Sequence, residues 1–140
     1  MIQSEVADRL CAQAGSSNYG AITAVLAYYG VAEKLFTVSA GNFMPAPKVN
    51  STVVRINLFK EKPYVPKDEK TLFRTIKGAF EQRRKTLPNA LASTFGELTK
   101  EEITDAILSC GHKADIRGER LDISQFVELS DKLYEIINNK

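Results

Sequence analysis

The sequence contains no tryptophan, one histidine and two cysteines, and these scarcities exclude several kinds of site. Cys11 and Cys110 lie near opposite ends of the chain, a spacing that provides neither a disulfide framework nor a thiol metal site. A histidine-rich metal site is excluded, and a His-based catalytic triad is possible only through His112. Because disulfides are rare in reducing compartments, the simplest expectation is a cytoplasmic protein.

The sequence also lacks a long apolar run and an N-terminal signal. No hydrophobic stretch approaches the ~20 residues that a membrane-spanning helix needs. Residues 1–5 lack the basic start and apolar core of a secretory signal. The composition is that of a globular chain: the 140 residues are 44% hydrophobic and 26% charged, which suits one ordinary domain or two small ones.

Charge is unevenly distributed in this chain, whose net charge is only +2. Residues 60–90 carry nine basic and four acidic side chains, whereas residues 91–140 carry six basic and ten acidic ones. A local basic band in a nearly neutral chain predicts a surface for a polyanion. The alternative is that the band is a solvated linker and helix face, which charge alone does not exclude.

Residues 1–59 follow an α/β pattern. We expect a helix capped by Ser4, a helix at about 20–29 ended by Gly30, and strands at 31–38 and 51–58, with irregular structure at 41–47. Two strands are too few for a stable sheet, so residues 1–3 are interpreted as the tail of a third strand in a chain that begins inside a domain. The two longer strands should pair antiparallel, leave apolar surface uncovered and favour self-association.

Residues 60–140 follow the pattern of a linker and several helices. Two prolines among charges predict a linker at 60–69, and an apolar stripe predicts a helix over 71–85. Thr86 should cap a further short helix that has Pro88 in its first turn. Two capping boxes predict the starts of later helices, the first of which ends at Gly111; they are Thr99 with Glu102 and Asp122 with Gln125.

Basic residues dominate the predicted 71–85 helix. Lys70, Arg74 and Lys77 recur at helical spacing with Arg84 on its exposed face. Arg83 projects nearer the apolar side, so it must pair with an acid, reach past the helix end or meet a ligand. The triplet Arg83-Arg84-Lys85 suits phosphate binding, and the same charges could instead neutralise a helix C-terminus.

Two further arginines have a structural interpretation. Arg117 and Arg120 are expected to form ion pairs with Glu119 or Asp115 rather than to bind a ligand.

Five sequence blocks resemble the ribosomal RNA adenine dimethyltransferase family. Three precede residue 59: QSEVADR at 3–9, YG at 19–20 and FMPAPKVNSTVVR at 43–55. Two more, FEQRRKTL at 80–87 and RGERL at 117–121, resemble the helical domain of the kasugamycin-sensitivity branch of that family. Together the blocks cover nearly all of the chain in the family's order.

The resemblance implies an S-adenosylmethionine-dependent enzyme that dimethylates N6 of two adjacent adenines near the 3′ end of small-subunit rRNA. The glycine-rich turn, the ribose-binding acid and the Asn-Leu-Pro-Tyr type motif of the family are absent from this sequence. The chain therefore resembles the C-terminal portion of the enzyme. By itself it is expected neither to bind S-adenosylmethionine nor to be active.

The resemblance also implies roles for individual residues. Phe43 matches the aromatic that stacks on the target base, an interaction worth ~1–3 kcal/mol per base; the alternative is that it packs into the core. Asn50 stands where aspartate is common, and Ala46 where a third proline is common, which affects loop rigidity. The expected RNA-binding set consists of Lys48, Arg74, Lys77, Arg83, Arg84 and Lys85.

These observations predict an α+β fold. Residues 1–59 form the C-terminal part of a Rossmann-like methyltransferase sheet, and residues 60–140 form a linker and a helical RNA-docking domain. The expected partners are small-subunit rRNA and the pre-small-subunit particle, without a membrane or a metal. One alternative is the antibiotic-resistance branch, which methylates large-subunit rRNA; the blocks at 80–87 and 117–121 argue against it. Another is a nucleic-acid-binding module that imitates a helix-turn-helix protein.

Overall fold

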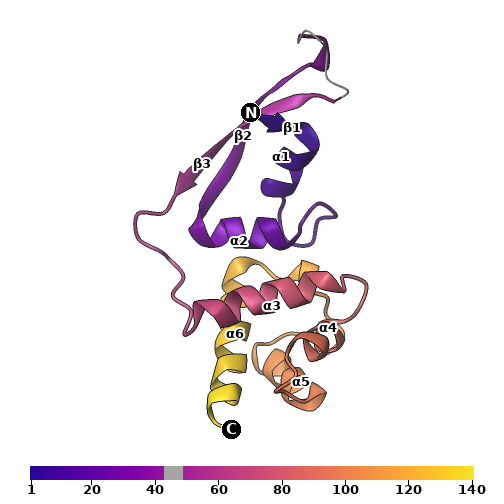
Figure 1. Ribbon diagram of the computed structural model, residues 1–140, viewed down its shortest axis with the longest axis vertical. Helices are drawn as coiled ribbons and strands as arrows, with labels where there is room; N and C mark the ends of the chain where they lie inside the picture. The colour runs from indigo at the N-terminus through magenta and orange to yellow at the C-terminus, as the bar shows by residue number, and fades with distance from the viewer. Residues whose placement is uncertain (43–48) are drawn as a thin grey trace. The chain divides into compact units, whose positions relative to one another are not determined.

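The computed structural model divides the chain between Lys62 and Pro63, within the predicted linker. We call Met1–Lys62 the sheet unit and Pro63–Lys140 the helical unit. Figure 1 shows the elements of both. The structure describes residues 1–42 and 49–140, so Phe43 and Lys48, two of the predicted site residues, lie outside the described residues.

The sheet unit contains a three-stranded sheet with its last strand at the centre. β3 (Ser51–Leu58) pairs antiparallel with β1 (Ile2–Gln3) on one side and with β2 (Gly30–Val38) on the other. β1 and β2 therefore run parallel to each other, and α1 (Ser4–Leu10) and α2 (Ala21–Tyr29) connect them. A helical connection between parallel strands is the usual crossover of α/β folds. The predicted antiparallel pairing and the third strand at 1–3 are both confirmed.

The two faces of this sheet are covered to different degrees. Thr52 of β3 is buried on the face that α1 covers, where Lys34 of β2 forms an ion pair of 2.8 Å with Asp8 of α1. Val31 and Phe36 of β2 lie on the other face and are 54% and 57% exposed. The prediction that the paired strands leave apolar surface uncovered is therefore confirmed.

Two local predictions for the sheet unit are wrong. Ser4 does not cap α1: Gln3 occupies the cap position without a side-chain hydrogen bond, and the Ser4 hydroxyl lies 2.7 Å from the hydroxyl of Thr52. The hydroxyl binds β3 because α1 begins directly where β1 ends. The expectation of irregular structure at 41–47 is wrong for Gly41 and Asn42, which belong to a short 3₁₀ helix, η1 (Ala40–Asn42), and residues 43–47 lie outside the described residues.

Both ends of the interdomain segment are held by their own unit. The Lys62 ammonium lies over the rings of Tyr28 and Tyr29, 5.0 and 5.5 Å from their centroids. At the other end, the Lys67 backbone N–H donates to Asp131 Oδ1 at 2.8 Å, and the Lys67 ammonium pairs with Glu135. Cation–π contacts anchor Lys62, and a hydrogen bond and an ion pair anchor Lys67. Residues 63–66 connect these two anchors.

The helical unit begins where a side chain caps its first helix. α3 (Glu69–Glu81) starts earlier than predicted because Asp68 accepts hydrogen bonds from the Thr71 backbone at 3.0 Å and hydroxyl at 2.6 Å. α4 (Leu87–Thr94) follows Thr86 and carries proline in its first turn. Then come α5 (Lys100–Ser109), the 3₁₀ helix η2 (Gly118–Arg120) and α6 (Ile123–Asn138).

The sequence signals for the later helices are confirmed. Thr99 and Glu102 form a capping box at the start of α5, and Asp122 and Gln125 form another at the start of α6. Gly111, with φ of 85°, follows the end of α5, in a conformation that glycine adopts without steric cost. Local capping chemistry thus sets most helix boundaries of this unit.

The core of the helical unit lies between α3, α4, α5 and α6. Its apolar side chains are almost fully buried, and the Phe80 and Phe126 rings pack with their centroids 6.0 Å apart. The buried set includes Leu72, Ile76, Leu87, Leu91, Phe95, Ile103, Ile107, Leu121, Phe126, Leu129 and Leu133. Burial of this kind stabilises a fold by roughly 1.5–3 kcal/mol per large side chain before entropy is counted.

Candidate nucleic-acid interface

The basic triplet lies in a turn and not on a helix. α3 ends at Glu81, and the Lys85 N–H donates to the Gln82 carbonyl at 3.0 Å to close the turn. The predicted helix over 71–85 is therefore too long. Thr86 is the N-cap of α4, and its backbone is extended. A helix cannot continue through an extended residue, so α3 ends before it. We call residues 82–85 the basic turn; its three basic side chains are exposed.

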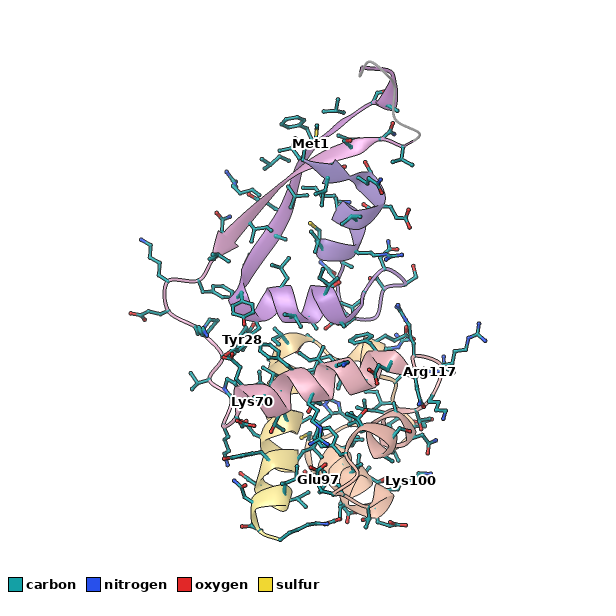
Figure 2. The ribbon with its side chains drawn as sticks, viewed as in Figure 1. Met1, Tyr28, Lys70, Glu97, Lys100 and Arg117 are labelled. Carbon is teal, nitrogen blue, oxygen red and sulfur yellow. The ribbon has the colours of Figure 1, made fainter. Side chains whose placement is uncertain are left out.

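A second segment is fixed against the basic turn. The Leu87 N–H donates to the Ile116 carbonyl at 2.7 Å, which joins the start of α4 to the segment before η2. Gly118 packs on α3 so closely that a Cβ there would lie 2.7 Å from the Ala79 Cβ. We call residues 116–120 the η2 loop. In Figure 2, Lys70 marks the first turn of α3 and Arg117 lies toward its last turn.

The ion pairs of this region differ from those expected. The Arg83 guanidinium pairs with Glu119 of the η2 loop, with Nε and Oε2 separated by 3.3 Å. The predicted pairing of Glu119 with Arg117 or Arg120 is therefore wrong. Of the three alternatives for Arg83, the structure shows pairing with an acid, which lies 36 positions further along the chain.

Four cations of the interface remain available for a ligand. Within residues 1–42 and 49–140, no ion pair involves Arg84, Lys85, Arg117 or Arg120, and all four are exposed. The sequence prediction missed Arg117 and Arg120 as members of this surface. The glycine between them was the available signal, since a residue without a side chain often marks close packing.

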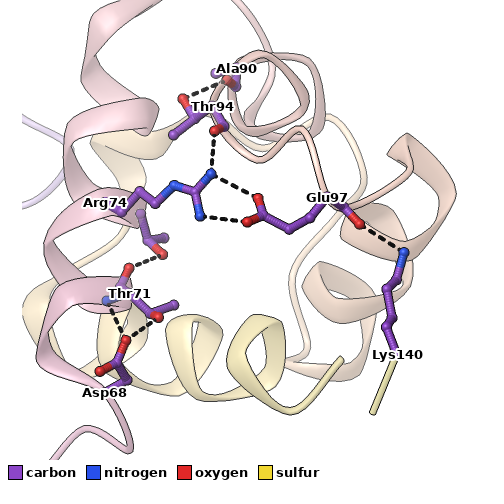
Figure 3. A network of polar contacts seen from close by, with 8 residues as sticks. Asp68, Thr71, Arg74, Ala90, Thr94, Glu97 and Lys140 are labelled. Carbon is purple, nitrogen blue, oxygen red and sulfur yellow. Dashed lines mark hydrogen bonds and ion pairs between the residues drawn. The ribbon is translucent and has the colours of Figure 1, made fainter. Parts of the chain in front are cut away.

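Arg74 does not belong to the exposed basic face where it was predicted. Its guanidinium makes a forked contact with the Glu97 carboxylate at 2.8 and 3.0 Å and also donates to the Thr94 carbonyl at 2.8 Å (Figure 3). The same group stacks 4.3 Å from the centroid of the buried Phe95 ring. These contacts use the planar fork of arginine to hold α3 against the end of α4. They argue against a role for Arg74 in RNA binding.

Lys77 is also partly neutralised. Its ammonium lies 3.8 Å from the carboxylate of Glu81, one turn further along α3, and both groups are well exposed. Pairs of this kind are weak and leave the lysine free to change partner. Lys77 therefore remains a candidate RNA contact near the basic turn, although Glu81 offsets part of its charge.

The base of the loop that contains Phe43 is closed by hydrogen bonds. The Asn50 side-chain oxygen accepts from the Ala40 N–H at 3.0 Å, and the Asn50 carbonyl accepts from the Ser4 N–H at 2.9 Å. The loop therefore leaves and rejoins the sheet at fixed points, at the end of β2 and the start of β3. An aspartate at this position would offer the same kind of acceptor oxygen.

Two features of cofactor and metal sites are missing from the described residues. The strand-to-helix junction between β1 and α1 is Gln3–Ser4, without a glycine that would let a ligand approach the backbone. In the described part of the chain, no group of three or more His, Cys, Asp or Glu side chains could hold a metal ion. No described helix is both long and apolar enough to cross a membrane.

The chain matches a family model described as ribosomal RNA adenine dimethylase over residues 1–133, so it belongs to this family. A Geobacillus kaustophilus protein named ribosomal RNA small subunit methyltransferase A is 42% identical over 135 residues, covering 95% of this chain and 46% of that protein. A protein of the same name from Halothermothrix orenii is 40% identical over 141 residues, covering 100% of this chain and 47% of that protein. The chain spans about half the length of these curated relatives.

Two solved structures share the fold. The dimethyladenosine transferase from Plasmodium falciparum aligns with a TM-score of 0.69 at 20% identity, covering 91% of this chain and 53% of that one. The 23S rRNA methyltransferase ErmE aligns with a TM-score of 0.62 at 17% identity, covering 94% and 52%. At these identities the likeness concerns the fold. It confirms the predicted fold class. The chain has a sheet part and a helical part, and together they match about half of a methyltransferase chain.

Proposed function

We propose that this chain is the C-terminal portion of an enzyme that dimethylates N6 of two adjacent adenines near the 3′ end of small-subunit rRNA. Its family and its 42% identity to a small-subunit rRNA methyltransferase support this assignment. The likeness to a large-subunit rRNA methyltransferase is at 17% identity and carries less weight. The sheet unit argues against a purely helical DNA-binding module. The reaction belongs to ribosome biogenesis, on the pre-small-subunit particle in the cytoplasm.

The observation that carries the RNA-docking role is the joining of the basic turn and the η2 loop. A hydrogen bond and close packing hold the η2 loop against α4 and α3, the helices on either side of the basic turn, and the Arg83–Glu119 pair joins the two segments directly. Both segments present exposed arginine or lysine side chains. Guanidinium and ammonium groups bind phosphate oxygens, and each phosphate that they neutralise releases counterions. We therefore assign RNA docking to Arg84 and Lys85, together with Arg83, Arg117 and Arg120, and with Lys77 as a flanking contact. Lys48 belongs to the sheet unit and lies outside the described residues, and its contact with RNA is proposed separately from this surface.

The sheet unit has a different proposed role, which is to present the target-base loop. N6 of adenine is a poor nucleophile because its lone pair is delocalised into the ring. The enzyme gains rate by holding the base out of its stack and aligning N6 with the methyl donor. Phe43 is proposed to stack on the base. The hydrogen bonds of Asn50 at the loop base support this by fixing where the loop leaves the sheet.

S-adenosylmethionine is the proposed methyl donor of the intact enzyme. The residues described here supply no glycine turn for it, so we place its site in the half that the longer relatives contain and this chain does not cover. We expect calorimetric titration of the 140-residue chain with S-adenosylmethionine to give no micromolar isotherm. A saturable micromolar signal would show that the cofactor site is wrongly placed.

RNA docking is tested by changing charge in the basic turn alone. The double variant Arg84→Gln/Lys85→Gln should weaken binding of a small-subunit rRNA 3′-terminal hairpin several-fold. Each lost phosphate contact should lower the slope of log affinity against log salt by ~0.9 for duplex or ~0.7 for single-stranded RNA. Adding Arg83→Gln should weaken binding further, with the melting temperature checked because that residue also pairs with Glu119.

The matched control is Lys60→Gln/Lys100→Gln, which removes the same charge from two exposed lysines outside the interface. It should shift affinity slightly and leave the salt slope nearly unchanged. If both double variants behave alike, the basic turn is surface solvation and the docking site lies elsewhere.

A further inference from the structure

We propose that Glu119 is a specificity-determining residue of this interface. The inference rests on the proposed RNA-docking function. Glu119 weakens binding to any phosphate backbone that offers no hydrogen-bond donor to its carboxylate. Because the 2′-hydroxyl of RNA is such a donor, Glu119 favours RNA over DNA of the same sequence.

Glu119 is the one negative charge of the interface. The basic turn and the η2 loop together contain five basic residues and a single acid. That acid stands between Arg117 and Arg120 in the chain and contacts the Arg83 Nε at 3.3 Å. Its side chain is 24% exposed, so it is accessible to a ligand that covers the surface.

The backbone that carries Glu119 is fixed. Gly118 packs against Ala79 without room for a side chain, and the Leu121 N–H donates to the Gly118 carbonyl at 3.1 Å. Leu121 itself is fully buried. The η2 loop cannot retreat from an approaching ligand as a mobile loop would, so the carboxylate stays beside Arg83 when the surface is occupied.

A phosphate that binds Arg83 therefore meets a carboxylate. Arginine has five N–H donors, so it can hold a phosphate while Nε stays with Glu119. The phosphate then lies a few ångströms from a second negative charge. Two like charges about 4 Å apart in water lower an affinity by about fivefold. A 2′-hydroxyl that donates to the carboxylate offsets this repulsion, whereas deoxyribose has no such group.

The test compares RNA and DNA with the full 140-residue chain. The probes are a hairpin RNA from the 3′-terminal region of small-subunit rRNA and a DNA hairpin of the same sequence, measured across a salt series. Glu119→Gln should tighten DNA binding by about fivefold and change RNA binding by less than about twofold, so that the RNA preference falls. Asp115→Asn is the matched control, since it removes an exposed carboxylate just outside the same loop.

The outcomes separate cleanly. If Glu119→Gln changes the RNA-to-DNA affinity ratio no more than Asp115→Asn does, the proposal is overturned. If Glu119→Gln weakens both ligands while remaining folded, Glu119 only positions Arg83 and the proposal is again overturned. If the glutamine variant folds poorly, the same RNA-to-DNA affinity ratio is measured with Glu119→Ala. If RNA binding by the wild-type chain did not weaken with added salt, the docking function itself would be overturned instead.

Discussion

The sheet unit and the helical unit bury their apolar residues to very different extents. Of the 20 buried apolar residues in the described part of the chain, 16 lie in the helical unit. Of the 12 large apolar residues that are exposed there, 10 lie in the sheet unit. The helical unit therefore completes its own core, whereas the sheet unit has the surface of a part that packs against more protein.

This difference matches the share of the family that the chain covers. The relatives extend over about twice its length, so the chain matches only about half of each of them. β2, with nine residues, is the longest strand, and β1 has only two. The two units of one chain thus differ in how far their apolar side chains are covered.

The largest expected effect is a contrast in stability between a core substitution and a surface substitution. Leu129→Ala removes a side chain that is 0% exposed in α6 and should cost about 2–5 kcal/mol of unfolding free energy. Phe36→Ala, on the uncovered face of β2, should cost less than about 0.5 kcal/mol. Urea unfolding of both variants checks this. A similar loss of unfolding free energy in both variants would mean that Phe36 is covered by another surface in solution.

Phe36 also offers a test of self-association, which we propose occurs through the uncovered strands. Phe36→Ser should reduce the concentration-dependent increase in light scattering, because it removes exposed apolar area beside an open sheet edge. Leu108→Ser is the matched control, since Leu108 is 50% exposed in the helical unit. Equal scattering from wild type and both variants would exclude this route.

A smaller effect is expected where the η2 loop packs on α3. Gly118→Ala places a Cβ 2.7 Å from the Ala79 Cβ, so it should destabilise the helical unit by about 1–3 kcal/mol. Gly96→Ala is the control, because no atom lies within 4 Å of the added Cβ there. Thermal melts of the two variants measure the difference. A neutral Gly118→Ala would mean that the η2 loop can shift, and would weaken the argument about Glu119.

At the base of the target loop, Asn50→Ala should expose the Ala40 amide. Losing this hydrogen bond is worth about 1 kcal/mol, or roughly fivefold faster hydrogen exchange at that amide. Asn50→Asp keeps an acceptor oxygen and should leave the exchange rate near that of wild type. Equal exchange in all three proteins would show that Asn50 does not hold the loop base.

The smallest effect is a pH dependence of the Arg74–Glu97 pair. Hydrogen bonds from Arg74 lower the pKa of Glu97 below its ordinary value of 4.5. A carboxyl with a lower pKa in the folded state stabilises the fold above pH ~4.5, and this is lost as pH falls through the folded pKa. Because the pair is open to water, the gain is at most about 1 kcal/mol.

Glu97→Gln should therefore lower the melting temperature slightly at pH 6 and not at pH 3. Glu101→Gln, an exposed carboxylate on α5 without an ion pair in the described chain, is the control. A melting-temperature gap that stays constant with pH would assign the effect of Glu97 to packing.

The sequence predicted elements well where the signals are local. The boxes at Thr99 and Asp122, the glycine after α5 and the alternation of β3 each depend on a few neighbouring residues. Strand pairing also followed, because apolar runs of this length have few other partners. The family blocks pointed to the basic triplet, which the structure places in an exposed turn. The target-base loop at 43–48 lies outside the described residues and stays a prediction.

Predictions failed where distant residues compete for a group. The Ser4 hydroxyl binds Thr52, and Glu119 binds Arg83, although closer partners were available in sequence. Helical spacing placed Arg74 on a solvent face, yet Phe95 and Glu97 draw its guanidinium into a network between helices. Such partners are brought together only by the packing of α3 on α4 and η2, which periodicity within one helix does not contain.

The interdomain segment is anchored at both ends, and this limits the length of free chain that links the two units. Between the Lys62 contact with Tyr28 and the Lys67 contact with Asp131 only residues 63–66 intervene. Five steps of extended chain span at most about 18 Å. If the two units have the roles proposed above, a tether this short would keep the sheet unit at a local concentration in the millimolar range once the helical unit had bound rRNA. Docking by one unit would thereby turn base capture by the other into an intramolecular event.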